Sequence, residues 1–144
     1  MKKNRIVFLG MFSLFLPVKM IAQNCQIQKI IINFIDMEVS YPFSIDSVTF
    51  RTLDYQSTCI DDPECLMMFQ DCLGKITQAK PEYKHLDIRR ELTVTYSDCN
   101  MVKLYVDNFH FLYNGTIYLY AGVMRKIIED KIDSYAQKNS ENQP

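Results

Sequence analysis

The sequence has few residues suited to nucleophilic or metal chemistry: five cysteines and two histidines. The cysteines stand at positions 25, 59, 65, 72 and 99, and the histidines at positions 85 and 110. This spacing contains no C-x-x-C pair and no zinc-finger arrangement. The one catalytic pair that it allows is a thiolate at Cys99 activated by the imidazole of His110, provided that the fold brings the two together.

The acidic residues also have a non-catalytic explanation. Asp61, Asp62 and Glu64 precede or begin a predicted helix, where carboxylates cap the first turn and complement the helix dipole. The sequence has no D-x-D-x-D calcium loop, and its four glycines form no loop that could cradle a phosphate. We therefore expect a protein that is not an enzyme and that has no metal ion and no cofactor.

The odd number of cysteines allows at most two disulfides within one chain. Cys65 and Cys72 lie seven residues apart on one predicted helix, about 10 Å along its axis, which is too far for a mutual bond. We predict bridges between Cys59 and Cys65 and between Cys72 and Cys99, with Cys25 left over. The spacing alone does not fix this connectivity.

The N-terminal residues resemble a signal for export. MKKNR is basic, the following segment 6–18 is uncharged, and Ala22 offers a cleavage site. The apolar run is shorter than the roughly 20 residues that span a membrane. We predict a signal peptide at 1–22 and a periplasmic or secreted protein without stable membrane insertion after cleavage; an uncleaved anchor is the alternative.

Removal of residues 1–22 would make the chain acidic. These residues hold four of the 16 Lys and Arg and none of the 17 Asp and Glu, so the remainder has 12 basic and 17 acidic residues and a net charge of −5. Such a chain is poorly suited to nucleic acid or to anionic membranes. Its length fits one domain, predicted at 23–137 and followed by a disordered polar tail at 138–144.

The first half of that domain contains two helical patterns around one weak strand pattern. Apolar residues from Ile27 to Ile35 recur at helical spacing, which predicts a helix starting at Gln26. Residues 47–56 are rich in β-branched and aromatic types and are predicted as a strand. Residues 61–77 begin with Asp-Asp-Pro-Glu and carry one apolar stripe, which predicts a second helix. A polar, exposed connection is expected to follow.

The pattern of the second half predicts four strands and a helix. Strands are predicted at 91–97, 101–106, 109–113 and 116–121, separated by short turns, although residues 101–113 could also form one long bent strand. A closing helix is predicted at 121–137. The expected fold is a single α+β domain with amphipathic helices packed on a mostly antiparallel meander, in the order α-β-α-β-β-β-β-α.

The last two strands form an aromatic hairpin around Asn114-Gly115. A two-residue turn there aligns the strands so that five aromatic side chains share one face: Phe109, Phe111, Tyr113, Tyr118 and Tyr120. The other face carries His110, Leu112, Ile117 and Leu119. The aromatic face is expected either to pack in the core, which we favour, or to form a binding surface for a protein, peptide or glycan. Asn114-Gly115-Thr116 is also a glycosylation acceptor, but its turn role accounts for it.

Three hypotheses for function follow. The first is a small exported, non-catalytic binding protein that contacts another protein or a glycan, such as an inhibitor or immunity-type protein. The second is a structural or assembly component of the cell envelope that self-associates through the hairpin edge or through Cys25. The third, which we disfavour, is an enzyme that uses Cys99 and His110.

Overall fold

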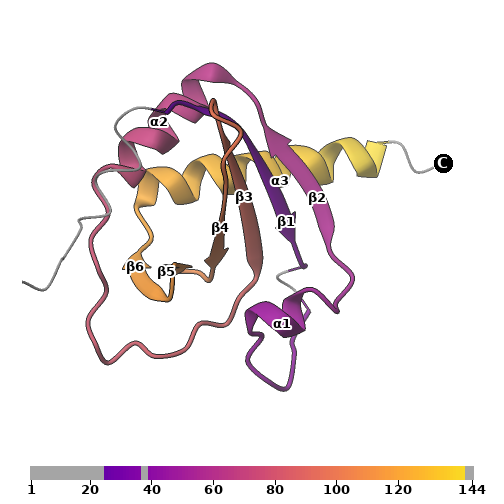
Figure 1. Cartoon of the computed structure of the whole chain (residues 1–144). Helices are drawn as coiled ribbons and strands as arrows, with labels where there is room; N and C mark the ends of the chain where they lie inside the picture. Colours follow the sequence, from indigo (N-terminus) through magenta and orange to yellow (C-terminus); the bar gives the residue numbers. More distant parts are fainter. Residues whose placement is uncertain (1–24, 37–38, 142–144) are drawn as a thin grey trace, which may run out of the picture.

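A computed structural model describes residues 25–36 and 39–141 (Figure 1). The predicted signal peptide, residues 1–22, lies outside these residues. In chain order the elements are β1 (Ile27–Phe34), α1 (Ser47–Phe50), β2 (Gln56–Ile60), α2 (Pro63–Leu73), β3 (Arg90–Tyr96), β4 (Met101–Val106), β5 (His110–Tyr113), β6 (Thr116–Leu119) and α3 (Gly122–Glu141).

The strands form one antiparallel sheet in the order β2-β1-β3-β4-β5-β6. Helices α2 and α3 lie on one face of this sheet, behind it in Figure 1. We call the other face the open face. The fold is α+β, as predicted, and the meander from β3 to β6 is confirmed, with β4 and β5 as separate strands.

The predicted helix at residues 26–38 is wrong, because Ile27–Phe34 forms strand β1. This strand lies between β2 and β3 and pairs with both. Ile30, Ile32 and Phe34 point into the core, whereas Ile31 points to the open face and is half-buried. Apolar side chains on both faces of a central strand produce a spacing that also fits a helix, which explains the wrong prediction. The β-branched isoleucines favour the strand that forms.

The predicted strand at residues 47–56 is also wrong, because only its last residue, Gln56, lies in a strand. Ser47–Phe50 forms the short helix α1, and the strand begins only at Gln56. Asp46 is the helix N-cap, and its carboxylate accepts hydrogen bonds from the backbone N–H groups of Val48 and Thr49. This capping stabilises a helical turn, although the segment contains β-branched residues.

Two of the predicted helices are confirmed, and one runs further than predicted. Asp62 caps α2 by accepting a hydrogen bond from the N–H of Cys65, and Pro63 occupies the first turn. Helix α3 continues to Glu141, so residues 138–141 of the predicted disordered tail are helical. None of the helices in the described ranges is long and apolar enough to cross a membrane.

The hairpin turn forms as its sequence predicts. Asn114 and Gly115 have positive φ angles of 47° and 75°, which suits a tight two-residue turn. Tyr113 pairs with Thr116, and the ladder continues through Phe111 and its partner Tyr118. The predicted register is therefore confirmed.

Two hydrophobic cores lie on opposite sides of the sheet. The larger lies between the sheet and the two long helices. The smaller lies on the open face under α1 and is built from Ile35, Ile45, Phe50, Leu86 and Ile88. The connection after α2, predicted to be exposed, thus supplies two of these buried residues. Among the described residues, the smaller core covers only the lower part of the open face in Figure 1 and leaves its upper part uncovered.

Candidate functional site

A row of polar side chains crosses four neighbouring strands on the open face. Ser57 of β2 stands opposite Asn33 of β1, Asn33 opposite Glu91 of β3, and Glu91 opposite Tyr105 of β4. Opposed residues of an antiparallel sheet share a face, so the register alone brings these side chains together. The row lies at the border between the smaller core and the uncovered part of the face.

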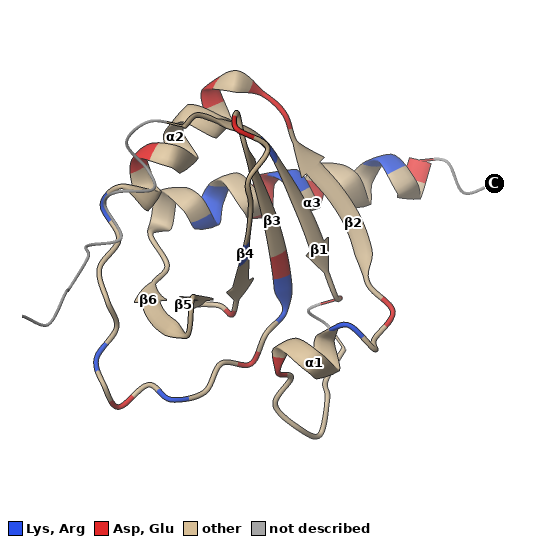
Figure 2. Cartoon of the chain, viewed as in Figure 1, with Lys and Arg blue, Asp and Glu red and all other residues tan. Residues whose placement is uncertain are grey.

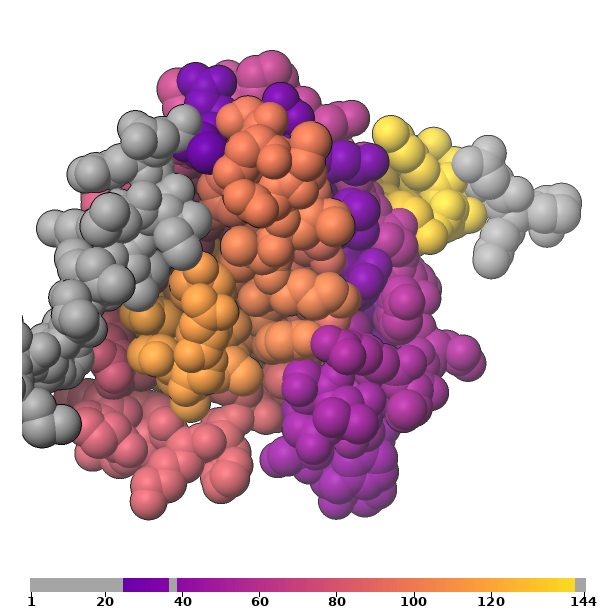
Figure 3. Space-filling view, in the orientation of Figure 1, coloured from indigo at the N-terminus to yellow at the C-terminus, as the bar shows by residue number. Residues whose placement is uncertain are grey.

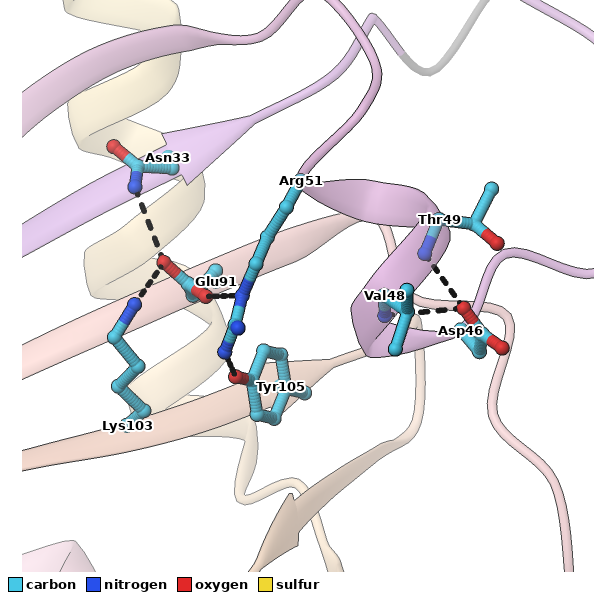
Figure 4. A network of polar contacts seen from close by, with 8 residues as sticks. All are labelled: Asn33, Asp46, Val48, Thr49, Arg51, Glu91, Lys103 and Tyr105. Carbon is cyan, nitrogen blue, oxygen red and sulfur yellow. Dashed lines mark hydrogen bonds and ion pairs between the residues drawn. The ribbon is translucent and has the colours of Figure 1, made fainter.

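Glu91 is the centre of the network in Figure 4, and its side chain is only 4% exposed. Its Oε1 accepts hydrogen bonds from Lys103 Nζ at 2.8 Å and from Asn33 Nδ2 at 3.3 Å. Its Oε2 lies 3.6 Å from Arg51 Nε and accepts no hydrogen bond from the described residues. One buried carboxylate therefore holds two cations and an amide.

The two cations are half-exposed: the side chain of Arg51 is 56% exposed and that of Lys103 is 46% exposed. Arg51 follows α1 directly and donates a hydrogen bond to the hydroxyl of Tyr105. This hydrogen bond, together with the charge of Glu91, raises the pKa of Arg51 above its ordinary value. The helix cap at Asp46 thus helps to place the guanidinium over the sheet.

This network anchors α1 to the sheet. A base that acts on an external substrate has to reach it, but Arg51, Lys103 and Asn33 enclose the carboxylate of Glu91. A substrate could contact this carboxylate only after Arg51 moved away. The geometry around Glu91 therefore suits holding α1 against the sheet rather than transferring a proton to or from a substrate.

A groove of about 460 Å³ lies beside the network, next to β4. It forms because β4 pairs with β5 only at Tyr105 and Val106, so the first part of β4 has no neighbouring strand on that side among the described residues. Its walls include Met101, which is 70% exposed, Tyr105, Leu112 and Tyr113, and Lys103 adds one cation. Figure 3 shows the face of the molecule on which β4 lies, with the residue 80–89 connection and α1 below it.

The five aromatic residues predicted as a binding face do not form one surface. Phe111, Tyr118 and Tyr120 are buried in the larger core, and the rings of Phe111 and Tyr118 stack with centroids 5.3 Å apart. Tyr113 is half-buried and lines the groove. Phe109 is 65% exposed and lies near Arg125 instead. Only Tyr113 and Phe109 thus offer accessible surface, at separate places.

Burial also changes the chemistry of one of these phenols. The hydroxyl of Tyr120 is buried without a hydrogen-bond partner in the part of the chain that the structure describes, and its burial raises the pKa of Tyr120 far above the ordinary value. Desolvation disfavours the phenolate. Tyr120 therefore stays neutral and belongs to the packing of α3 on the sheet.

All five cysteines are free in the structure, which contains neither of the two predicted disulfides. Cys59 stands opposite Ile31 in the strand ladder and therefore lies on the open face. Cys65 packs against the larger core on the other side of the sheet. Cys72 lies on α2, and Cys99 lies in the turn between β3 and β4. The helix and strand spacing gave no information on which side of the sheet each thiol would lie.

The thiol of Cys25 interacts with a carboxylate. A hydrogen bond with Asp98 raises the pKa of Cys25, and desolvation adds to this increase. A thiol with a raised pKa is a poor nucleophile at neutral pH. This interaction ties the chain before β1 to the turn between β3 and β4.

The Cys99 and His110 side chains do not form a catalytic pair. They belong to opposite ends of β4, whose residues span roughly 16 Å at about 3.3 Å per residue. His110 is buried, its Nδ1 lies 3.5 Å from Asp107 Oδ2, and its ring lies 4.3 Å from that of Tyr83. No group of three or more His, Cys, Asp or Glu within the described residues could hold a metal ion.

The hairpin edge that we considered for self-association is covered. Residues 77–79 run along β6, where Ala79 N–H donates to the carbonyl of Ile117 and Leu119 N–H donates to that of Thr77. These contacts use backbone groups of β6 that a second chain would need for strand pairing at this edge.

Comparisons with protein-family models, with curated proteins and with solved structures find no match to this chain.

Proposed function

We propose that this protein is a small exported, non-catalytic binding protein that holds a segment of a partner protein in the groove beside β4. The observation that carries the proposal is the combination of a concave surface with apolar and aromatic walls and a cation at its edge. Interface cores are enriched in Tyr and Met, and a pocket of this size can seat one or two side chains of a partner.

The absence of an assembled catalytic set among the described residues supports the non-catalytic part of the proposal. Cys99 and His110 lie apart, and the carboxylate of Glu91 is enclosed by its own partners. Catalysis requires groups that converge where a substrate can bind. An inhibitor or immunity-type protein needs only a complementary surface.

Export is proposed from the N-terminal sequence. Intact-mass measurement of the protein purified from the medium or the periplasm is expected to give a chain that begins at Gln23. A protein that keeps residues 1–22 and stays in the cytoplasm would contradict export, while the groove proposal would stand.

The groove is tested by site-specific photocrosslinking. A photoreactive amino acid placed at Met101, in the groove, is compared with the same amino acid at Met67, which is 62% exposed on α2. With envelope extract and secreted proteins, Met101 is expected to give one discrete adduct and Met67 none. Unlabelled wild-type protein should suppress the adduct, whereas a Met101→Glu competitor should not.

Two results would contradict the proposal. One is the same adduct pattern from both positions, because exposure alone would then explain the reaction. The other is equal suppression by the wild type and by Met101→Glu, because the groove would then not contribute to binding.

A further inference from the structure

The outer edge of β2 is unpaired. Strand β2 pairs with β1 on one side, and no other strand of the described ranges pairs with its second side. Strand edges offer rows of N–H and C=O groups to other chains, and proteins usually block them with lysine, proline, a bulge or a covering segment. The sequence Gln56–Ile60 contains neither lysine nor proline, its ladder to β1 has no bulge, and the opposite edge of the sheet is covered by residues 77–79.

Two exposed carboxylates bracket this edge. Asp54 lies just before β2 and Asp61 just after it, and Figure 2 shows acidic colouring at both ends of the strand. Neither side chain has a hydrogen bond or an ion pair within the part of the chain that the structure describes. Asp62, in contrast, is used as the cap of α2. The two uncompensated charges are roughly 23 Å apart along an extended chain.

These charges make a second copy of this chain an unfavourable partner for the free edge of β2. If two β2 strands paired antiparallel about Thr58, Asp54 of one copy would stand opposite Asp62 of the other. If they paired parallel and in register, each carboxylate would stand beside its own copy. Like charges placed opposite each other destabilise a strand pair.

We propose that β2 accepts an extended segment of a partner protein as an additional strand, and that this segment carries Lys or Arg near each end. Main-chain hydrogen bonds to the free edge supply affinity, and the ion pairs with Asp54 and Asp61 supply selectivity. The inference rests on the proposed function as a protein-binding protein, but it uses a surface separate from the groove beside β4.

The test is a selection from random displayed peptides of about twelve residues, enough to cover the distance between the two carboxylates. The full chain serves as bait, and the Asp54→Lys/Asp61→Lys variant serves for counter-selection. A Glu82→Lys/Asp71→Lys variant changes the net charge by the same amount at two other exposed positions and is the matched control. Hydrogen exchange of residues 56–60 reports whether a strand has been added.

The selected peptides are expected to carry Lys or Arg on both sides of about five uncharged residues, matching the length of β2. They should bind the wild type and the control variant at least about ten-fold more tightly than Asp54→Lys/Asp61→Lys, and they should protect the amides of residues 56–60. Absence of enriched peptides, enrichment without basic ends, or protection elsewhere would overturn the inference.

A concentration-dependent dimer of the wild type that protects residues 56–60 would also overturn it, in favour of a second copy. Failure of the peptide selection leaves the crosslink at Met101 unaffected, and failure of that crosslink leaves peptide binding at β2 measurable. The two proposals can therefore fail separately.

Discussion

Side-chain alternation in the predicted strand 109–113 places Phe109 and Phe111 on the same face, but their environments in the structure differ. Phe111 is fully buried and stacks on Tyr118, whereas Phe109 is 65% exposed. Replacing a buried phenylalanine by alanine usually costs about 3–5 kcal/mol, because apolar contacts are lost and a cavity remains. Replacing an exposed one costs about 0.5 kcal/mol or less. We expect Phe111→Ala to lose about 4 kcal/mol and Phe109→Ala almost nothing.

Urea unfolding of both variants measures this difference. With a slope of about 2 kcal/mol per M, the midpoint of Phe111→Ala should fall by about 2 M and that of Phe109→Ala by about 0.25 M. If Phe111→Ala does not fold, Phe111→Leu should still fold and be less stable than Phe109→Leu. Equal midpoints for the two positions would refute the assignment of the aromatic face to the core.

Three further outcomes are expected. Glu91→Gln should lower the free energy of unfolding by about 1–3 kcal/mol in urea titrations, because the neutral amide removes the negative charge that pairs with Lys103 and Arg51; an unchanged midpoint would show that the network does not anchor α1. Gly115→Ala should cost about 1–2 kcal/mol, because φ is 75° there, and the thermal midpoint should fall accordingly. Backbone N–H donation from Cys65 lowers the pKa of Asp62 below 3.8, so its stabilisation is complete above that pH and is lost as the pH falls through the native pKa. Asp62→Asn keeps the cap without this titration, so its stability should fall less steeply in acid than that of the wild type.

The elements that the sequence predicted correctly are those with local signals. Asp62 and Pro63 mark the start of α2, and Asn114-Gly115 determines both the turn and the register of the last hairpin. The first strand was missed because its isoleucines lie on both faces of a central strand, and their spacing then fits a helix equally well. Local pattern alone could not show that two strands would enclose it.

The candidate site could not be found from the sequence for a related reason. Asn33, Glu91 and Arg51 come from three distant segments: strand pairing aligns Asn33 with Glu91, and the position of α1 brings Arg51 to them. Glu91 is the first residue of the predicted strand at 91–97, where a charged residue suggests an exposed strand end, so the sequence contains no local signal of its burial. The groove beside β4 depends on the different lengths of β4 and β5, which turn signals do not determine.

The smaller core has a consequence for how the molecule opens. It is built from connecting segments rather than from the helices that cover the main core, and a backbone hydrogen bond from Ile88 to Ile45 joins its two halves. A unit of this kind can detach while the sheet and the long helices remain folded. Its departure would carry Arg51 away from Glu91 and expose the carboxylate to water. The chain would then have a second, partly opened form with a different charge on its open face, and hydrogen exchange of residues 39–55 would report how often it occurs.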